Sequence, residues 1–189
     1  LTPGEFAFSS PSWLPDSSGL VCNGAGHDTW DRDWAQDLYL VDLNGERRRL
    51  TGTDGMYYAP SVSPDGTRVA FVGTRTPMLG GQNGRVGVLE LSSGHWDFLE
   101  TGIDRTFAPY PYLQAPIWSD GALLVSYEDR GDVLVRRIPL DGSAPTTLTP
   151  PDRTVLGFDA REGSFAYSVT TFDRPAELAL LVDGAECRI

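Results

Sequence analysis

Four repeats of the same strand and turn signals predict an all-β chain of about four four-stranded antiparallel sheets. A turn segment that begins with Pro or Gly recurs four times, each time followed by an apolar run. Glycine turns recur at residues 45, 94, 142 and 184, in step with the first signal. No segment shows a sustained helical period with caps, so very little helix is expected. Repeated four-stranded units of about 40 to 50 residues are typical of β-propeller blades.

The repeated turns are expected between the first two strands of each unit. Gly, Asn and Asp tolerate the positive φ that tight hairpins need. The apolar runs that follow, at 20–22, 69–72, 123–125 and 165–167, are expected as second strands because they are rich in residues that favour strands. The turns read Pro11-Ser-Trp-Leu-Pro-Asp-Ser-Ser-Gly19, Pro60-Ser-Val-Ser-Pro-Asp-Gly66, Pro116-Ile-Trp-Ser-Asp-Gly121 and Gly157-Phe-Asp-Ala-Arg-Glu-Gly163.

Each unit then continues with a third strand, a glycine turn and a short closing strand. Third strands are expected at 37–43, 86–91, 133–140 and 177–182, and closing strands at 48–51, 96–99, 146–149 and 187–189. A β-sandwich with turns at the same spacing is the competing architecture, but it gives no reason for two sets of signals to keep step. Residues 1–189 are therefore expected to form a partial propeller with blades at about 3–52, 53–103, 104–151 and 152–189.

Both ends of the chain read as cut. A propeller closes on itself to hide its edges and the faces between its blades. Four blades can close in principle, but Leu1-Thr2 matches the closing Leu50-Thr51 and Leu148-Thr149 and reads as the tail of a preceding unit. We therefore expect this chain to be a piece of a longer protein, with the remaining blades as its partners. Trp13 and Trp118 are expected to fill gaps between blades, with a ligand platform as the alternative.

Composition excludes several functional classes. The chain has 15 Arg, no Lys and 26 Asp or Glu, for a formal net charge of −11, so no nucleic-acid surface is expected. No apolar stretch approaches the roughly 20 residues of a membrane span, so no membrane contact is expected. No signal peptide is visible, although a removed leader stays open. Cys22 and Cys187 are expected as small buried or half-buried residues, with a disulfide or a reactive thiol as alternatives, and a reducing, cytoplasmic compartment is favoured.

Catalytic motifs are absent from the sequence. It has no Gly-x-Ser-x-Gly elbow, and the glycines at 80–84 lack the context of a phosphate loop. The acidic insertion at 26–37, which contains His27, suggests a cation site but lacks the regular ladder of a calcium loop. Solvated charge or pairing with Arg32 is the preferred interpretation, and His95 is expected at the surface. We expect no metal, no cofactor and no catalytic residue in this chain.

Three long loops are expected on a single face of the propeller. They span 24–36, 74–84 and 102–112, and strand direction places loops between second and third strands on the same face as connections between blades. Long loops on a rigid scaffold often carry function. Arginines there can pair with a peptide carboxylate and aromatic rings can contact substrate, whereas packing against another domain or subunit is the competing interpretation. The candidate contact residues are Trp30, Arg32, Trp34, Arg75, Met78, Phe107, Tyr110 and Tyr112.

Two segments carry a resemblance to known families. Ala59-Pro-Ser-Val-Ser-Pro-Asp-Gly-Thr-Arg-Val-Ala-Phe-Val72 resembles the Pro-Asp-Gly repeat shared by Tol-system propellers and the prolyl oligopeptidase family. Thr170-Thr-Phe-Asp-Arg-Pro-Ala-Glu-Leu178 resembles a segment of late blades in acylaminoacyl-peptidase-like members of that family, and the blade pattern from Asp37 to Thr51 also fits. The resemblance covers nearly the whole chain, but only as propeller.

That resemblance implies a seven- or eight-bladed propeller capping an α/β-hydrolase domain with a Ser-Asp-His triad. No triad residue has a counterpart here, so none is carried over. The intact protein would be a cytoplasmic serine peptidase that hydrolyses short or N-acylated peptides by acyl transfer. This chain would be the C-terminal half of its propeller, and its role would be to exclude folded proteins. Its partners would be the hydrolase domain, which would follow Ile189, and the peptide substrate. A homo-oligomer is left open. The alternative is a Tol-like periplasmic propeller that binds a protein partner without enzymatic activity.

Overall fold

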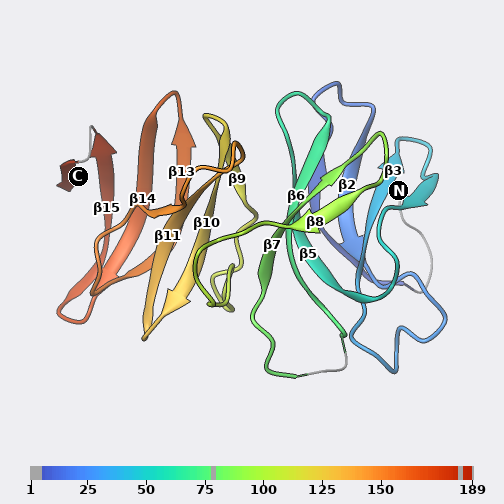
Figure 1. Ribbon diagram of the computed structural model, residues 1–189, viewed down its shortest axis with the longest axis horizontal. Helices are drawn as coiled ribbons and strands as arrows, with labels where there is room; N and C mark the ends of the chain where they lie inside the picture. The colour runs from blue at the N-terminus through green and yellow to red at the C-terminus, as the bar shows by residue number, and fades with distance from the viewer. Residues whose placement is uncertain (1–5, 78–79, 183–184, 189) are drawn as a thin grey trace. The chain divides into compact units, whose positions relative to one another are not determined.

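Residues 6–77, 80–182 and 185–188 are described by the computed structural model (Figure 1). The chain divides into two compact units, unit 1 (residues 1–100) and unit 2 (residues 101–189), and each is described by itself. Every regular element in the described residues is a β-strand. The all-β prediction is therefore confirmed, and no helix in this part of the chain offers a membrane-spanning segment.

Unit 1 contains two four-stranded antiparallel sheets, each with its strands in sequence order. We call them the first and second blades. The expected third strands of this unit coincide with β3 and β7 to within one residue at each end. The first blade consists of β1(Phe8–Trp13), β2(Gly19–Gly24), β3(Asp37–Asp42) and β4(Arg47–Arg49). The second consists of β5(Gly55–Val62), β6(Arg68–Arg75), β7(Arg85–Glu90) and β8(Trp96–Phe98).

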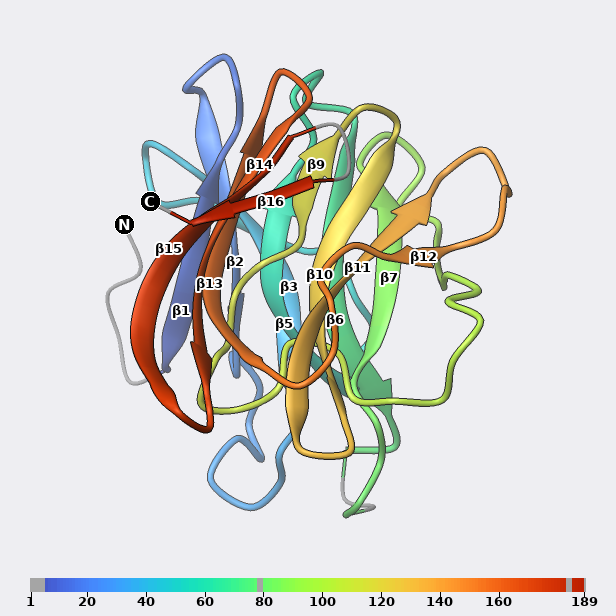
Figure 2. The same cartoon turned by 90° about the vertical axis from the view of Figure 1, so that its left-hand side faces the viewer.

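Unit 2 repeats the arrangement as the third and fourth blades. A parallel pair between Val133 and Thr154 joins these blades into one eight-stranded sheet, and in unit 1 a parallel bridge between Gln36 and Met56 has the same place. Figure 2 shows the strands of the fourth blade side by side. The third blade consists of β9(Ile117–Ser119), β10(Ala122–Asp129), β11(Asp132–Pro139) and β12(Thr146–Thr147). The fourth consists of β13(Thr154–Arg161), β14(Ser164–Thr171), β15(Arg174–Val182) and β16(Ala185–Arg188).

The Pro-Asp-Gly turn between β5 and β6 is held by the side chain of Asp65. Its Oδ1 accepts hydrogen bonds from the Ser63 hydroxyl at 2.5 Å, the Thr67 hydroxyl at 2.8 Å and the Thr67 backbone N–H at 3.0 Å. Gly66 follows with a φ of 71°, which glycine adopts without steric cost. The bonds from Ser63 and Thr67 lower the pKa of Asp65 to about 2.

The Asp65 turn is expected to weaken only in strong acid. Because its folded pKa lies below the ordinary value of 3.8, this carboxylate stabilises the folded chain above about pH 4, and the contribution is lost as pH falls through about 2. An NMR titration of the Asp65 carboxyl carbon should give a midpoint near pH 2. A midpoint near pH 4 would contradict the turn geometry, and Asp65→Asn provides the control that lacks this titration.

Leu-Thr dipeptides close the first and third blades in the same way. The Leu38 N–H donates to the Thr51 hydroxyl at 3.0 Å, and its carbonyl accepts from the Leu50 N–H at 2.8 Å. In the third blade Val135 makes the same pair of bonds, to the Thr149 hydroxyl at 3.1 Å and from the Leu148 N–H at 2.8 Å. The repeated dipeptide therefore extends the pairing of the third strand by one buried side-chain hydrogen bond.

Each unit has its own apolar core between its two blades. In unit 1, residues from both blades form one buried cluster, and Phe71 at its centre contacts the rings of Tyr57, Trp96 and Phe98 at centroid distances of 5.5–6.1 Å. In unit 2 the cluster includes Val135 from the third blade and Phe165 from the fourth. Because β-strands alternate their side chains, each blade has one face in such a core.

The two tryptophans expected between blades differ in burial. Trp13 does not pack between the two blades of unit 1 and is 57% exposed, whereas Trp118 is half-buried. The Ser12 hydroxyl accepts a hydrogen bond from the Val62 N–H at 3.0 Å, so the alternation of β1 turns Trp13 away from the second blade. Cys22 is buried as expected, and desolvation raises the pKa of its thiol to about 11, but Cys187 is exposed.

Candidate functional site

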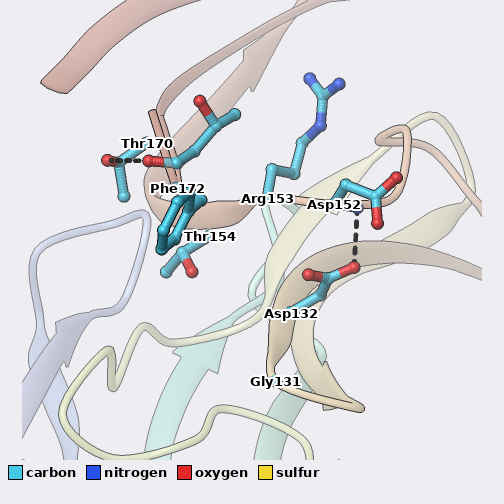
Figure 3. Close-up of a pocket in the computed structure, with 8 residues that line it drawn as sticks. Gly131, Asp132, Asp152, Arg153, Thr154, Thr170 and Phe172 are labelled. Carbon is cyan, nitrogen blue, oxygen red and sulfur yellow. Dashed lines mark hydrogen bonds between the residues drawn. The ribbon is translucent and has the colours of Figure 1, made fainter. Parts of the chain in front are cut away.

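A pocket of about 400 Å³ lies at one end of unit 2 (Figure 3). It is formed by the turn between β10 and β11, the connection from β12 to β13 and the hairpin between β14 and β15. Thr154 and Phe172 lie on one side, and Asp132, Asp152 and Arg153 on the other. The lining residues are Gly131, Asp132, Asp152, Arg153, Thr154, Thr170, Thr171 and Phe172.

The β10–β11 turn places the carboxylate of Asp132. Asp129 and Asp132 pair directly, and the two residues between them, Arg130 and Gly131, have φ values of 54° and 93°. Positive φ at both central residues fits the twist of a two-residue hairpin. Asp132 Oδ2 then accepts a hydrogen bond from the Asp152 N–H at 2.8 Å, which fixes the incoming connection against β11 (Figure 3).

The β14–β15 hairpin presents an apolar side chain to solvent. The Thr171 hydroxyl donates to Asp173 Oδ1 at 2.9 Å, and the Thr170 hydroxyl donates to the Arg174 carbonyl at 2.8 Å. These bonds hold the ends of a turn whose tip is Phe172, a fully exposed ring. A single exposed apolar residue is ordinary, but one at a pocket rim gives that rim an apolar contact surface.

Arg153 is held by the protein itself. Its Nη1 lies 2.6 Å from Glu186 Oε2, and the buried Tyr167 hydroxyl donates to the same carboxylate oxygen. The side chain of Arg153 is only 12% exposed. Its charge is therefore balanced within the fourth blade, and the polar groups that the pocket offers a ligand are the Asp132 and Asp152 carboxylates and the threonine hydroxyls.

In unit 1, the acidic insertion folds around Asp33. His27 Nε2 lies 2.9 Å from Asp33 Oδ1, the Thr29 hydroxyl donates to Oδ2 at 2.6 Å, and the Ala35 N–H donates to Oδ1 at 2.9 Å. The bonds from Thr29, His27 and Ala35 lower the pKa of Asp33 to about 2. Asp33 therefore has protein partners, and the His, Cys, Asp and Glu of the described residues form no group of three that could hold a metal ion.

The described candidate contact residues of unit 1 lie in the loop between β2 and β3 and at the C-terminal end of β6, and these segments lie at the same end of the unit (Figure 1). Trp30 is 39% exposed and Trp34 62%, and the Arg32 side chain is exposed near Asp31. Arg75 is less available, because its Nη1 lies 3.1 Å from Asp54 Oδ2 and its guanidinium stacks 4.4 Å from the Trp96 ring centroid. The candidate Met78 lies outside the described residues.

Candidates in the connection before β9 divide into core and surface. Phe107 is 1% exposed and packs 5.9 Å from the Tyr127 ring, so it is a core residue of unit 2 rather than a contact residue. Its backbone pairs with Tyr127, which fixes this burial. Tyr110 is 86% exposed and Tyr112 is half-buried.

The connection before β9 also lies at the pocket end of unit 2. Arg105 Nε donates to Asp129 Oδ1 at 2.7 Å, beside the β10–β11 turn. The sequence did not predict this pocket, because two of its three walls are two-residue turns. The candidate residues were chosen from long loops instead. The available signal was Phe172, an aromatic residue between polar neighbours in the segment 170–178.

Comparison with known proteins gives likenesses of two kinds. No family model matches the chain. A TolB homolog from Chlorobium luteolum is 38% identical over 77 residues, which are 40% of this chain and 16% of that protein. TolB from Acinetobacter baumannii has a TM-score of 0.66 at 19% identity, covering 96% of this chain and 43% of that chain.

The second kind of likeness is to peptidases. A puromycin-hydrolyzing peptidase from Mycobacterium tuberculosis has a TM-score of 0.74 at 18% identity, over 99% of this chain and 32% of that chain. The β-propeller domain of the Trilobed protease from Pyrococcus furiosus has a TM-score of 0.72 at 17% identity, over 99% of this chain and 55% of that chain.

These likenesses show the fold, since the identities to the solved structures are below 25%. This chain spans between about a sixth and about half of the length of these proteins. Propeller blades are four-stranded antiparallel sheets, and each unit here contains two sets of four antiparallel strands in sequence order. The chain therefore folds as blades of a β-propeller, two in each unit, a fold that it shares with TolB proteins and with peptidases.

Proposed function

We propose that this chain is the propeller part of a cytoplasmic serine peptidase of the prolyl oligopeptidase family, similar to acylaminoacyl peptidases, that hydrolyses short or N-acylated peptides. One observation carries the proposal. The segment Thr170–Leu178, which resembles that family in sequence, forms the hairpin whose tip residue Phe172 lines the pocket of unit 2. In the intact protein, an α/β-hydrolase domain would supply the catalytic serine.

The chemistry of the pocket suits binding rather than catalysis. Threonine hydroxyls and the Asp132 carboxylate can hydrogen-bond to a peptide, and the Phe172 ring can cover an apolar side chain. The lining has no Ser or Cys nucleophile and no His base. We therefore assign the propeller the role of selecting peptides by size and contact, while acyl transfer takes place in the hydrolase domain.

Phe172→Ala in the full-length protein is expected to raise KM for short N-acetylated peptides about 5-fold and to leave kcat unchanged. Loss of about 1 kcal/mol of ring contact, made equally in the bound substrate and the transition state, gives this pattern. Steady-state kinetics measure both constants. Leu43→Ala, which removes another exposed apolar side chain in a turn of the first blade, should change neither. Equal effects of the two variants would count against a substrate contact at Phe172.

A TolB-like module that binds a protein partner in the periplasm is the second candidate. The 38% identity over 77 residues to a TolB homolog favours it. The two candidates differ in one chemical requirement, because only the peptidase needs a reactive serine elsewhere in the full-length protein.

A further inference from the structure

The face of the first blade that points away from the second carries an unusual set of polar groups. Tyr39 pairs with Arg49 and Val41 with Arg47, so Arg47 and Arg49 lie on the same face as Tyr39, whereas Arg48 lies on the opposite face. A cavity of about 340 Å³ on this face is lined by Phe6, Phe8, Gly26, Tyr39, Arg47 and Arg49.

Tyr39 has a buried hydroxyl that lacks an acceptor. The residue is 6% exposed, and its hydroxyl donates to no group of the described residues, while the Gly26 backbone beside it acts only as a donor that lowers the pKa of the phenol. Burial and the nearby Asp37 carboxylate raise the pKa of this phenol, so it stays protonated and can donate. A buried polar group without a partner is costly, so it calls for an acceptor from outside these residues.

Arg47 also lacks an acidic partner in the described structure. Its guanidinium lies 5.3 Å from the Phe8 ring centroid, and no carboxylate of the described residues lies within ion-pair distance of it. Arg49 is partly engaged, with a hydrogen bond to Thr53 at 2.9 Å and Asp37 at 3.9 Å.

The second blade shows what covers the equivalent face. In the first blade, Arg47 pairs with Val41 and Arg49 pairs with Tyr39. The equivalent pairs of the second blade are Trp96 with Leu89 and Phe98 with Gly87. Trp96 and Phe98 therefore have the places of Arg47 and Arg49. In the second blade this face packs on the first blade, in the cluster that Phe98 shares with Val21 and Leu38. By the repeat, the corresponding face of the first blade fits another four-stranded sheet.

We propose that a further blade of the same protein covers this face and places a carboxylate between Arg47 and the Tyr39 hydroxyl. The inference rests on the part of the proposed function in which the full-length protein has further blades. A second copy of this chain is the competing occupant. The outer face of its fourth blade offers apolar contact through the exposed Leu178 and Val182 of β15, and β13 carries the exposed Asp159 on the same face, so the dependence on protein concentration distinguishes the two occupants.

Arginine modification by phenylglyoxal in the full-length protein tests this proposal residue by residue. Arg47 and Arg48 are both exposed in the present chain and are adjacent in sequence, so Arg48 is a matched control. We expect Arg47 to react at least about 10-fold more slowly than Arg48, as read by tandem mass spectrometry, independently of protein concentration. Equal rates would overturn the proposal, and protection that grows with concentration would indicate a second copy and overturn it too.

The carboxylate is tested by thermal unfolding of variants of the full-length protein. Arg47→Gln should lower the unfolding midpoint by about 4 °C, Arg47→Lys should restore most of the loss, and Arg48→Gln should change it by under about 1 °C. If Arg47 is protected from modification but Arg47→Gln and Arg48→Gln have equal unfolding midpoints, the proposal that a carboxylate pairs with Arg47 is overturned. Neither arginine modification nor thermal unfolding depends on peptidase activity. A failure of the proposed peptidase function can therefore be distinguished from a failure of the proposed blade contact.

Discussion

Replacing Phe71 with alanine is expected to lower the free energy of unfolding of unit 1 by about 4 kcal/mol. The ring is fully buried between the two blades and contacts Tyr57, Trp96 and Phe98, so truncation leaves a cavity that three rigid rings cannot fill. Gly87, directly opposite Phe71, has no side chain and leaves the space that the ring occupies. Denaturant unfolding, followed by amide hydrogen exchange in β6, measures the loss.

The control for Phe71→Ala is the same change at Phe172. Phe172 is fully exposed at the tip of the β14–β15 hairpin, so Phe172→Ala should alter the free energy of unfolding by less than about 0.5 kcal/mol. Similar losses at the two positions would contradict the assignment of the unit 1 core.

Asp37→Ala, a second change in unit 1, is expected to lower the free energy of unfolding by about 3 kcal/mol. The carboxylate is fully buried and accepts hydrogen bonds from the Thr51 hydroxyl at 2.6 Å, the Thr53 hydroxyl at 2.6 Å and the Thr53 N–H at 2.8 Å. Its removal leaves three buried or half-buried donors without an acceptor at the connection from the first blade to the second. Chemical denaturation of the variant measures the effect.

Asp31→Ala is the matched control for Asp37→Ala. Asp31 belongs to the same acidic insertion, but its side chain is 58% exposed and lies 3.8 Å from an exposed arginine. Such pairs contribute little, so a change below about 0.5 kcal/mol is expected. A loss at Asp37 no greater than the loss at Asp31 would show that the network does not stabilise the blade connection.

Strands and turns could be predicted from this sequence because their signals are local. Asp65-Gly66 and the glycines at 45, 94 and 142 indicate turns through backbone conformations that few other residues adopt, and these glycines have positive φ. Alternating apolar runs indicate strands. Both kinds of signal depend only on residues that are neighbours in sequence. Because the unit repeats four times, each signal occurs four times along the chain.

Burial and contact could not be predicted equally well, because they depend on which face of a strand meets another sheet. Trp13 resembles a core residue by type, yet Ser12 is the residue of β1 that bonds to the second blade. Phe107 lies in a long connection, yet backbone pairing with Tyr127 carries it into the core. Asp37 was grouped with solvated loop charge, although the threonines that bury it lie 14 and 16 residues further along the chain.

Labelling of the full-length protein with a fluorophosphonate probe tests the peptidase proposal most directly, because the probe reacts with an activated serine whatever the peptide specificity. We expect one serine outside residues 1–189 to be labelled, with parallel loss of hydrolysis of N-acetylated dipeptides and no labelling after heat denaturation. A folded full-length protein that neither reacts with the probe nor hydrolyses these peptides would contradict the proposal and favour the protein-binding module.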